Sequence, residues 1–209
     1  VLDRGDNLVN LYAKWPPIPS TFRLVMAEAA LGLQQKQRAI DLLTQCVGAV
    51  PTEASWKAWM RMANIYEWDF DSKNAMGIYG KIAAEAPRTL VLAYLARLRI
   101  ADLQSRTDSL RARADSTFRA LSQDSGYPFP LPRLIAQLYQ SELTEAQFRN
   151  AIEVLNPGDH PSYYLARKAQ RAANRSATVK YLRELAKNTI ARSWNSHAIE
   201  RAVSHWNRW

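Results

Sequence analysis

The stretch from residue 56 to residue 87 constrains the fold of this chain more than any other. It reads WKAWMRMANIYEWDFDSKNAMGIYGKIAAEAP, and its apolar residues recur at helical offsets on either side of a polar break. Those residues are Trp59, Met62, Ala63 and Tyr66 before the break, and Ala75, Tyr79 and Ile82 after it. Because an α-helix repeats every 3.6 residues, each set lies on one helix face. The small residues Ala63 and Ala75 allow two helices to cross closely, so the stretch predicts an antiparallel helix pair that ends at Pro87.

Residues 20–51 show the same arrangement one unit earlier. The corresponding positions are Arg23, Met26, Ala27 and Ala30 in a first helix, and Ala39, Leu43 and Cys46 in a second. Gly32 stands where the first helix should stop, and Pro51 closes the unit as Pro87 closes the next. Two adjacent units with matching offsets predict a repeat and not an isolated helix pair.

These two units resemble the tetratricopeptide (TPR) repeat, whose pattern is W-x2-L-G-x2-Y, then A-x3-F, then P, with a period of about 34 residues. The closing prolines, Pro51 and Pro87, are 36 residues apart. Residues 56–87 also resemble the half-a-TPR (HAT) repeats of RNA-processing scaffolds, through Trp59, Glu67 and the run from Ala75 to Tyr79. The Glu-Arg-Ala that usually follows the aromatic residue in HAT repeats is missing, which favours the TPR-like interpretation.

The rest of the chain extends the array with weaker resemblance. The predicted elements are a third, lengthened pair over residues 89–124, a fourth pair over Arg133–Ser141 and Thr144–Leu155, a fifth pair over Pro161–Ala173 and Ser176–Arg192, and a final helix over Asn195–Trp209. The final helix is expected because an uncapped solenoid exposes its core. Residues 125–132 hold three prolines and a glycine, which we interpret as a break without helix.

The predicted fold is therefore all-α. The resemblance implies a right-handed α-solenoid of about five antiparallel helix pairs with a C-terminal capping helix. We divide the chain into an N-terminal segment with a Pro-rich connector (1–19), TPR-like repeats (20–124), the Pro-rich break (125–132), and degenerate repeats with a basic capping helix (133–209). Glycine is scarce, with seven residues in 209, which also favours helix over sheet.

No motif in the sequence indicates catalysis. It contains no glycine-rich phosphate loop, no Gly-x-Ser-x-Gly elbow, no HExxH and no dinucleotide fingerprint. The single cysteine, Cys46, falls on the inner face of a predicted helix, where a small buried thiol is expected. We predict a protein that is not an enzyme and that has no cofactor and no metal site.

The TPR resemblance implies a concave groove lined by the first helices of successive pairs. The implied groove positions are Leu24, Glu28, Leu31, Lys57, Met60, Asn64 and Glu67. The predicted function is a scaffold or adaptor that holds a protein partner in this groove, within a multi-subunit assembly. No apolar run approaches the roughly 18 residues of a membrane-spanning helix, so no transmembrane segment is expected.

The net charge of +9 is concentrated in the second half of the chain. Residues 1–104 carry 12 Lys and Arg against 10 Asp and Glu, whereas residues 105–209 carry 16 against 9. Four basic residues with helical spacing form a candidate patch for an anionic partner: Arg167, Lys168, Arg171 and Arg175. The alternative function is thus an RNA-associated helical-repeat protein, although an acidic protein or a membrane surface would meet the same charge. A solvated basic surface beside a core of aromatic residues explains the pattern as well.

Overall fold

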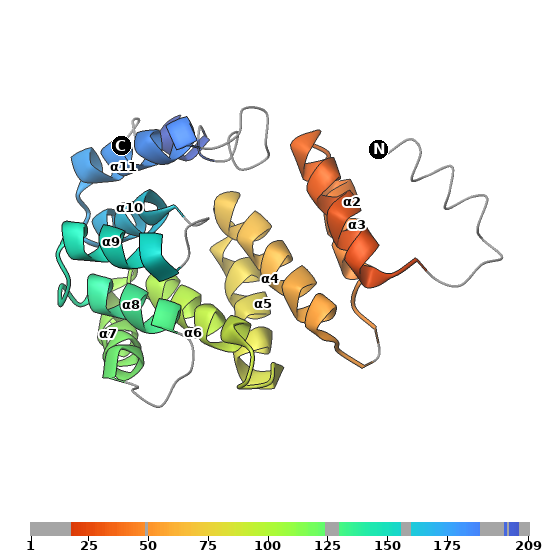
Figure 1. The fold of residues 1–209 in the computed structure, drawn as a ribbon, viewed down its shortest axis with the longest axis horizontal. Helices are drawn as coiled ribbons and strands as arrows, with labels where there is room; N and C mark the ends of the chain where they lie inside the picture. Colours follow the sequence, from red (N-terminus) through yellow and green to blue (C-terminus); the bar gives the residue numbers. More distant parts are fainter. Residues whose placement is uncertain are drawn as a thin grey trace.

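The structure, a computed structural model, describes residues 18–48, 50–123, 130–155, 160–188, 199 and 201–204. Within these residues the chain forms ten helices from α2 to α11, helical backbone at residues 199 and 201–204, and no strand, which confirms the predicted all-α class for the described part (Figure 1). The helices are α2 (Ser20–Gly32), α3 (Lys36–Thr44), α4 (Glu53–Trp68), α5 (Ser72–Glu85), α6 (Val91–Gln104), α7 (Asp108–Gln123), α8 (Pro130–Tyr139), α9 (Glu145–Leu155), α10 (Pro161–Arg171) and α11 (Arg175–Asn188). The predicted N-terminal segment and connector up to residue 17, and most of the predicted capping helix, lie outside the described residues.

The helices pack in the order of the sequence. Each helix contacts the next one along the chain from α2 to α11. In addition, α2, α4, α6, α8 and α10 contact one another in series, each with the next of this set. Figure 1 shows the resulting stack, with α2 and α3 at one end and α11 at the other. The fold is therefore repeat-like, with every second helix contributing to one common layer.

Four of the turns between consecutive helices have the same backbone geometry. Each contains one non-glycine residue with positive φ: Gln34, Phe70, Ser141 and Ala173. In each turn the amide of the next residue donates to a carbonyl five residues before it, as Asp71 N does to Tyr66 O at 2.9 Å. This left-handed helix ending satisfies the last carbonyls of the helix. The same ending follows α2, α4, α8 and α10. It is therefore an internal structural repeat that is visible in the backbone and does not require the same side chains in each turn.

One of these turns provides a test of backbone strain. Ala173 has φ of 52°, a conformation that costs a residue with a Cβ about 1–2 kcal/mol. We expect Ala173→Gly to raise the free energy of unfolding by about 0.5–1 kcal/mol in urea titrations, because glycine adopts this φ without strain. The preceding Ala172 has φ of −82°, so Ala172→Gly should lower stability instead. Equal effects of the two substitutions would contradict the strain argument.

Alanines occupy the places where helices cross closely. The small positions predicted from the sequence, Ala27, Ala39, Ala63, Ala75, Ala96 and Ala114, are all fully buried. They lie within consecutive apolar clusters, the first between α2, α3 and α4, the second between α4, α5 and α6, and the third from α6 to α10. Cys46 is also buried, and burial raises the pKa of its thiol, as expected for a structural residue.

The Pro-rich break requires a correction. Residues 125–129 lie outside the described residues, but α8 begins at Pro130 and includes Pro132, where the sequence predicted no helix before residue 133. Prolines are tolerated here because the first turn of a helix has no intrahelical acceptor for its N–H groups. Among the described helices, none combines the length and apolar content needed to span a bilayer.

Candidate partner-binding site

The predicted groove residues lie on two helices that contact each other. Leu24, Glu28 and Leu31 belong to α2, and Lys57, Met60, Asn64 and Glu67 belong to α4. Their exposure divides them into two groups. Glu28 and Lys57 are exposed, and Leu24, Met60 and Asn64 are half-buried. Leu31 and Glu67 are buried, so a partner could not reach them in this structure.

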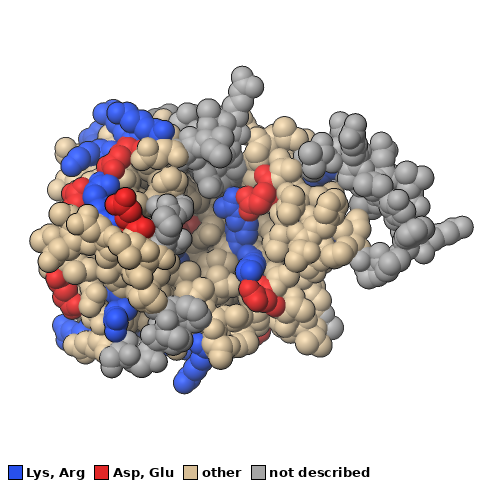
Figure 2. Space-filling model, viewed as in Figure 1, with Lys and Arg blue, Asp and Glu red and all other residues tan. Residues whose placement is uncertain are grey.

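A fork-shaped ion pair joins α2 to α4 beside the exposed residues. Arg61 Nε lies 2.6 Å from Glu28 Oε1, and Arg61 Nη2 lies 2.7 Å from Glu28 Oε2. One turn away on α4, Lys57 Nζ lies 2.7 Å from Glu53 Oε1. Figure 2 shows basic and acidic side chains next to each other along the middle of this surface, where α4 lies in Figure 1. We call the residues Leu24, Glu28, Lys57, Met60 and Arg61 the α2–α4 face.

The far end of α4 is occupied by the protein itself. Arg167 of α10 bonds to Glu67 of α4, 100 residues away in sequence, and its Nε donates to Asp102 Oδ2 of α6 at 2.7 Å. Arg106 Nη2 lies 3.5 Å from the same Asp102 oxygen. We call Glu67, Asp102, Arg106 and Arg167 the buried ion cluster. Within it, Arg167 ties α4, α6 and α10 together at this point.

The Tyr79 side chain completes the contacts of Glu67 and also contacts Asn64. The Tyr79 hydroxyl oxygen lies 2.7 Å from Glu67 Oε2 and 2.6 Å from Asn64 Oδ1. The fully buried Tyr79 comes from α5 and packs beneath α4. Asn64 and Glu67, both predicted to face a partner, therefore have partners inside the fold.

Electrostatics keeps the two carboxyls of the cluster ionised. Burial alone would raise the pKa of Glu67 and of Asp102, because it disfavours the charged form. The neighbouring guanidinium groups, Arg167 foremost, outweigh burial and hold both pKa values below their ordinary range. Near neutral pH the charges of Glu67, Asp102 and Arg167 are therefore paired and removed from water, whereas Arg106 remains partly exposed.

The four residues of the predicted anionic-partner patch lie in three different places. Arg167 is 8% exposed and belongs to the buried ion cluster, so it is not a surface residue. Lys168 and Arg171 line a pocket of about 220 Å³ between α7, α8 and α10. Arg171 is bonded to Asp115, and it donates to the Tyr139 carbonyl at 3.2 Å. Arg175 lies at the start of α11. Sequence spacing alone does not bring these four residues into one patch.

The sequence analysis missed Asp102, Arg106 and Arg99. The signal for two of them is visible in α6, where Arg97, Arg99 and Asp102 are the only charged residues among fourteen. A charge inside an otherwise apolar helix indicates either a buried ion pair or a functional site. Here Arg99 stacks over Tyr163, with its guanidinium carbon 4.5 Å from the ring centroid. All three residues therefore lie at the contact between α6 and α10 or within the cluster.

Comparison with known proteins found no matching family model, no similar curated protein and no similar solved structure. The repeated turns, the alternating helix contacts and the charged surfaces are therefore the features of this chain that bear on its function.

Proposed function

We propose that this chain is a right-handed, TPR-like α-solenoid of five antiparallel helix pairs with a C-terminal capping helix, and that it acts as a non-enzymatic scaffold or adaptor for a protein partner. The observation that carries the proposal is the serial contact of α2, α4, α6, α8 and α10. In TPR proteins the first helices of successive pairs line the partner groove. The recurring left-handed turns support the same division of the chain into units.

The α2–α4 face is the part of this layer that a partner can reach. Beyond it, Arg167 fills the space next to Glu67 and Asp102. We place the partner against Leu24 and Met60, which are half-buried and provide apolar contact. Exposed Glu28 and Lys57 lie beside them with opposite charges. A suitable partner is a protein segment with apolar anchor residues flanked by charges of both signs. These charges determine where along the face the segment binds more than they determine its affinity.

A matched pair of double variants tests this placement. Lys57→Glu with Met60→Gln changes the α2–α4 face, and we expect it to lower capture of the partner at least tenfold, since it removes an apolar anchor and reverses a charge. The control is Lys73→Glu with Met76→Gln on α5, which has the same residue types, spacing and burial classes. The measurement is an affinity pull-down from the native source with nuclease, at near-physiological and high salt, followed by mass spectrometry.

A protein that is retained at high salt by the wild type and by the α5 variant, and lost only by the α4 variant, supports the scaffold function at this face. If the two double variants retain the same proteins in the same amounts, the α2–α4 face is not the binding site.

A further inference from the structure

One face of α11 carries three exposed cations: Lys180, Arg183 and Lys187. Their separations of three and four residues place each one on the turn next to its neighbour. With a rise of 1.5 Å per residue, the steps along the helix axis are about 4.5 and 6 Å. Like charges at these separations repel one another, which destabilises the bare helix and favours any ligand that supplies regularly spaced negative charge.

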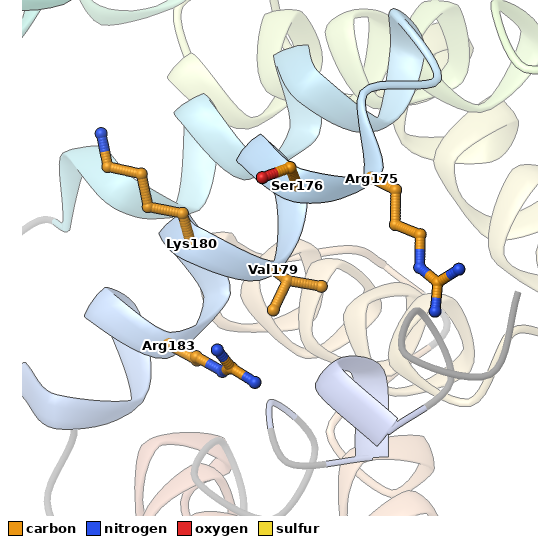
Figure 3. A pocket seen from close by; sticks show the side chains of 5 residues that line it. All are labelled: Arg175, Ser176, Val179, Lys180 and Arg183. Carbon is orange, nitrogen blue, oxygen red and sulfur yellow. The ribbon is translucent and has the colours of Figure 1, made fainter.

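A hollow lies beside these cations. It has a volume of about 500 Å³, and the described residues that line it are Arg175, Ser176, Val179, Lys180 and Arg183. Figure 3 shows the guanidinium groups of Arg175 and Arg183 extending on the same side of α11, with Val179 between them. None of the described residues that line the hollow is acidic. Its floor is apolar and its rim is positively charged.

Two carboxylates lie near these cations, that of Glu184 on the same helix and that of Glu145 on α9. Arg149 of α9 binds Glu184 with two hydrogen bonds, Nη1 to Oε1 at 2.7 Å and Nη2 to Oε2 at 2.9 Å. Arg149 also donates from Nε to Glu145 Oε1 at 2.9 Å, and Tyr181 donates to Glu145 Oε2 at 2.6 Å. These bonds hold both acidic side chains toward α9. Lys180 also lies close enough to both carboxylates to lower their pKa values, so these acids partly offset its charge, whereas no described residue that lines the hollow is acidic. Figure 2 shows basic side chains over α11 with acidic side chains next to them.

The shape and composition of this surface favour a nucleic-acid strand over an anionic lipid bilayer as the ligand. Of the apolar residues of α11 that a membrane-binding helix would insert, Leu182 and Leu185 are buried inside the protein, and Val179 lines the hollow with only 9% of its surface exposed. A flat bilayer would also not enter the hollow between Arg175 and Arg183. A flexible strand of phosphates can follow a row of cations and occupy the hollow beside it.

We propose that Lys180, Arg183 and Lys187, with the adjoining hollow, bind the phosphate backbone of single-stranded nucleic acid. The contact is independent of base sequence, because the cations meet phosphates and not base edges. This activity is separate from the protein-partner site, which lies on α2 and α4.

The test measures binding of a dye-labelled 20-nucleotide oligouridylate by fluorescence anisotropy. Three phosphate contacts on a single strand give a slope of about −2 for log affinity against log salt, so affinity should fall about twentyfold between about 50 and 200 mM salt. The triple variant Lys180→Gln, Arg183→Gln, Lys187→Gln should bind at least about tenfold more weakly at 50 mM salt, with a slope near zero. Arg183→Gln alone should lose about one third of the slope.

The control removes the same charge elsewhere. Lys73→Gln, Arg88→Gln and Arg119→Gln replace three exposed cations on other surfaces, and this variant should bind within about twofold of the wild type. Equal weakening of the two triple variants would show that only net charge matters and would overturn the proposal. Absence of oligonucleotide binding at low salt would also overturn it. So would binding of phosphatidylserine vesicles or poly-glutamate that requires the three cations, when the oligonucleotide does not bind.

Discussion

Replacing Arg167 with methionine should lower the free energy of unfolding by about 3–5 kcal/mol, because it leaves two buried carboxylates without their main partner. The side chains of Glu67 and Asp102 are only 5% and 1% exposed, so water does not replace the lost guanidinium. Arg106 remains nearby, but its contacts to the two acids, at 3.9 and 3.5 Å, are longer than those of Arg167. Urea unfolding followed by circular dichroism measures the loss.

Arg149→Met is the matched control for this prediction. Arg149 also binds two carboxylates, those of Glu145 and Glu184, but its side chain is 30% exposed. Solvent screens this pair and solvates the acids when the arginine is removed, so the expected cost is about 1 kcal/mol or less. If both substitutions lower the free energy of unfolding by similar amounts, burial of the ion cluster does not determine how much it contributes to stability. The variant that also carries Glu67→Gln and Asp102→Asn should recover part of the Arg167→Met loss, because no unpaired charge then remains.

The helices and their crossings could be predicted from the sequence because both depend on local spacing. Ala63 and Ala75 were predicted to lie between α4 and α5, and Ala96 and Ala114 within the lengthened pair that follows; all four are fully buried. The start of α8 was predicted three residues late because the prolines were interpreted only as helix breakers. Proline does not break a helix when it lies in the first turn.

The tertiary contacts of polar residues could not be predicted in the same way. Glu67 has the spacing of a groove residue and Arg167 the spacing of a surface residue, yet the two meet inside the protein. The two residues are 100 positions apart in the sequence, so their contact depends on the packing of all the helices between them. Local periodicity carries no information about that packing. The isolated charges of α6 indicated that some polar group was buried, but not which residue would pair with it.

Acid should unfold this protein through the same cluster. The folded-state pKa values of Glu67 and Asp102 lie below their ordinary values, because Arg167 and its neighbours outweigh the effect of burial. A carboxyl with a depressed pKa contributes its stability fully above its unfolded pKa, which is about 4.3 for Glu and about 3.9 for Asp. That contribution is lost as the pH falls through the lower folded-state values. We therefore expect these two groups to add no pH dependence between pH 7 and about 5, and a steep loss of stability below about pH 4.

Carbon-13 NMR titration of the side-chain carboxyls measures this directly, since Glu67 and Asp102 should remain ionised to pH values below the ordinary range of Glu and Asp carboxyls. The Glu67→Gln, Asp102→Asn variant should be less stable than the wild type at pH 7, and its stability should depend less on pH between about 5 and 2. Glu145→Gln provides the comparison, because this more exposed acid bonds to Tyr181 and Arg149 outside the cluster. If Glu67 and Asp102 titrate with ordinary pKa values, or if the double variant keeps the full acid dependence, the cluster does not control acid unfolding. If the steep loss of stability at low pH remains in Glu145→Gln and disappears in the double variant, the contact between α4, α6 and α10 is its cause.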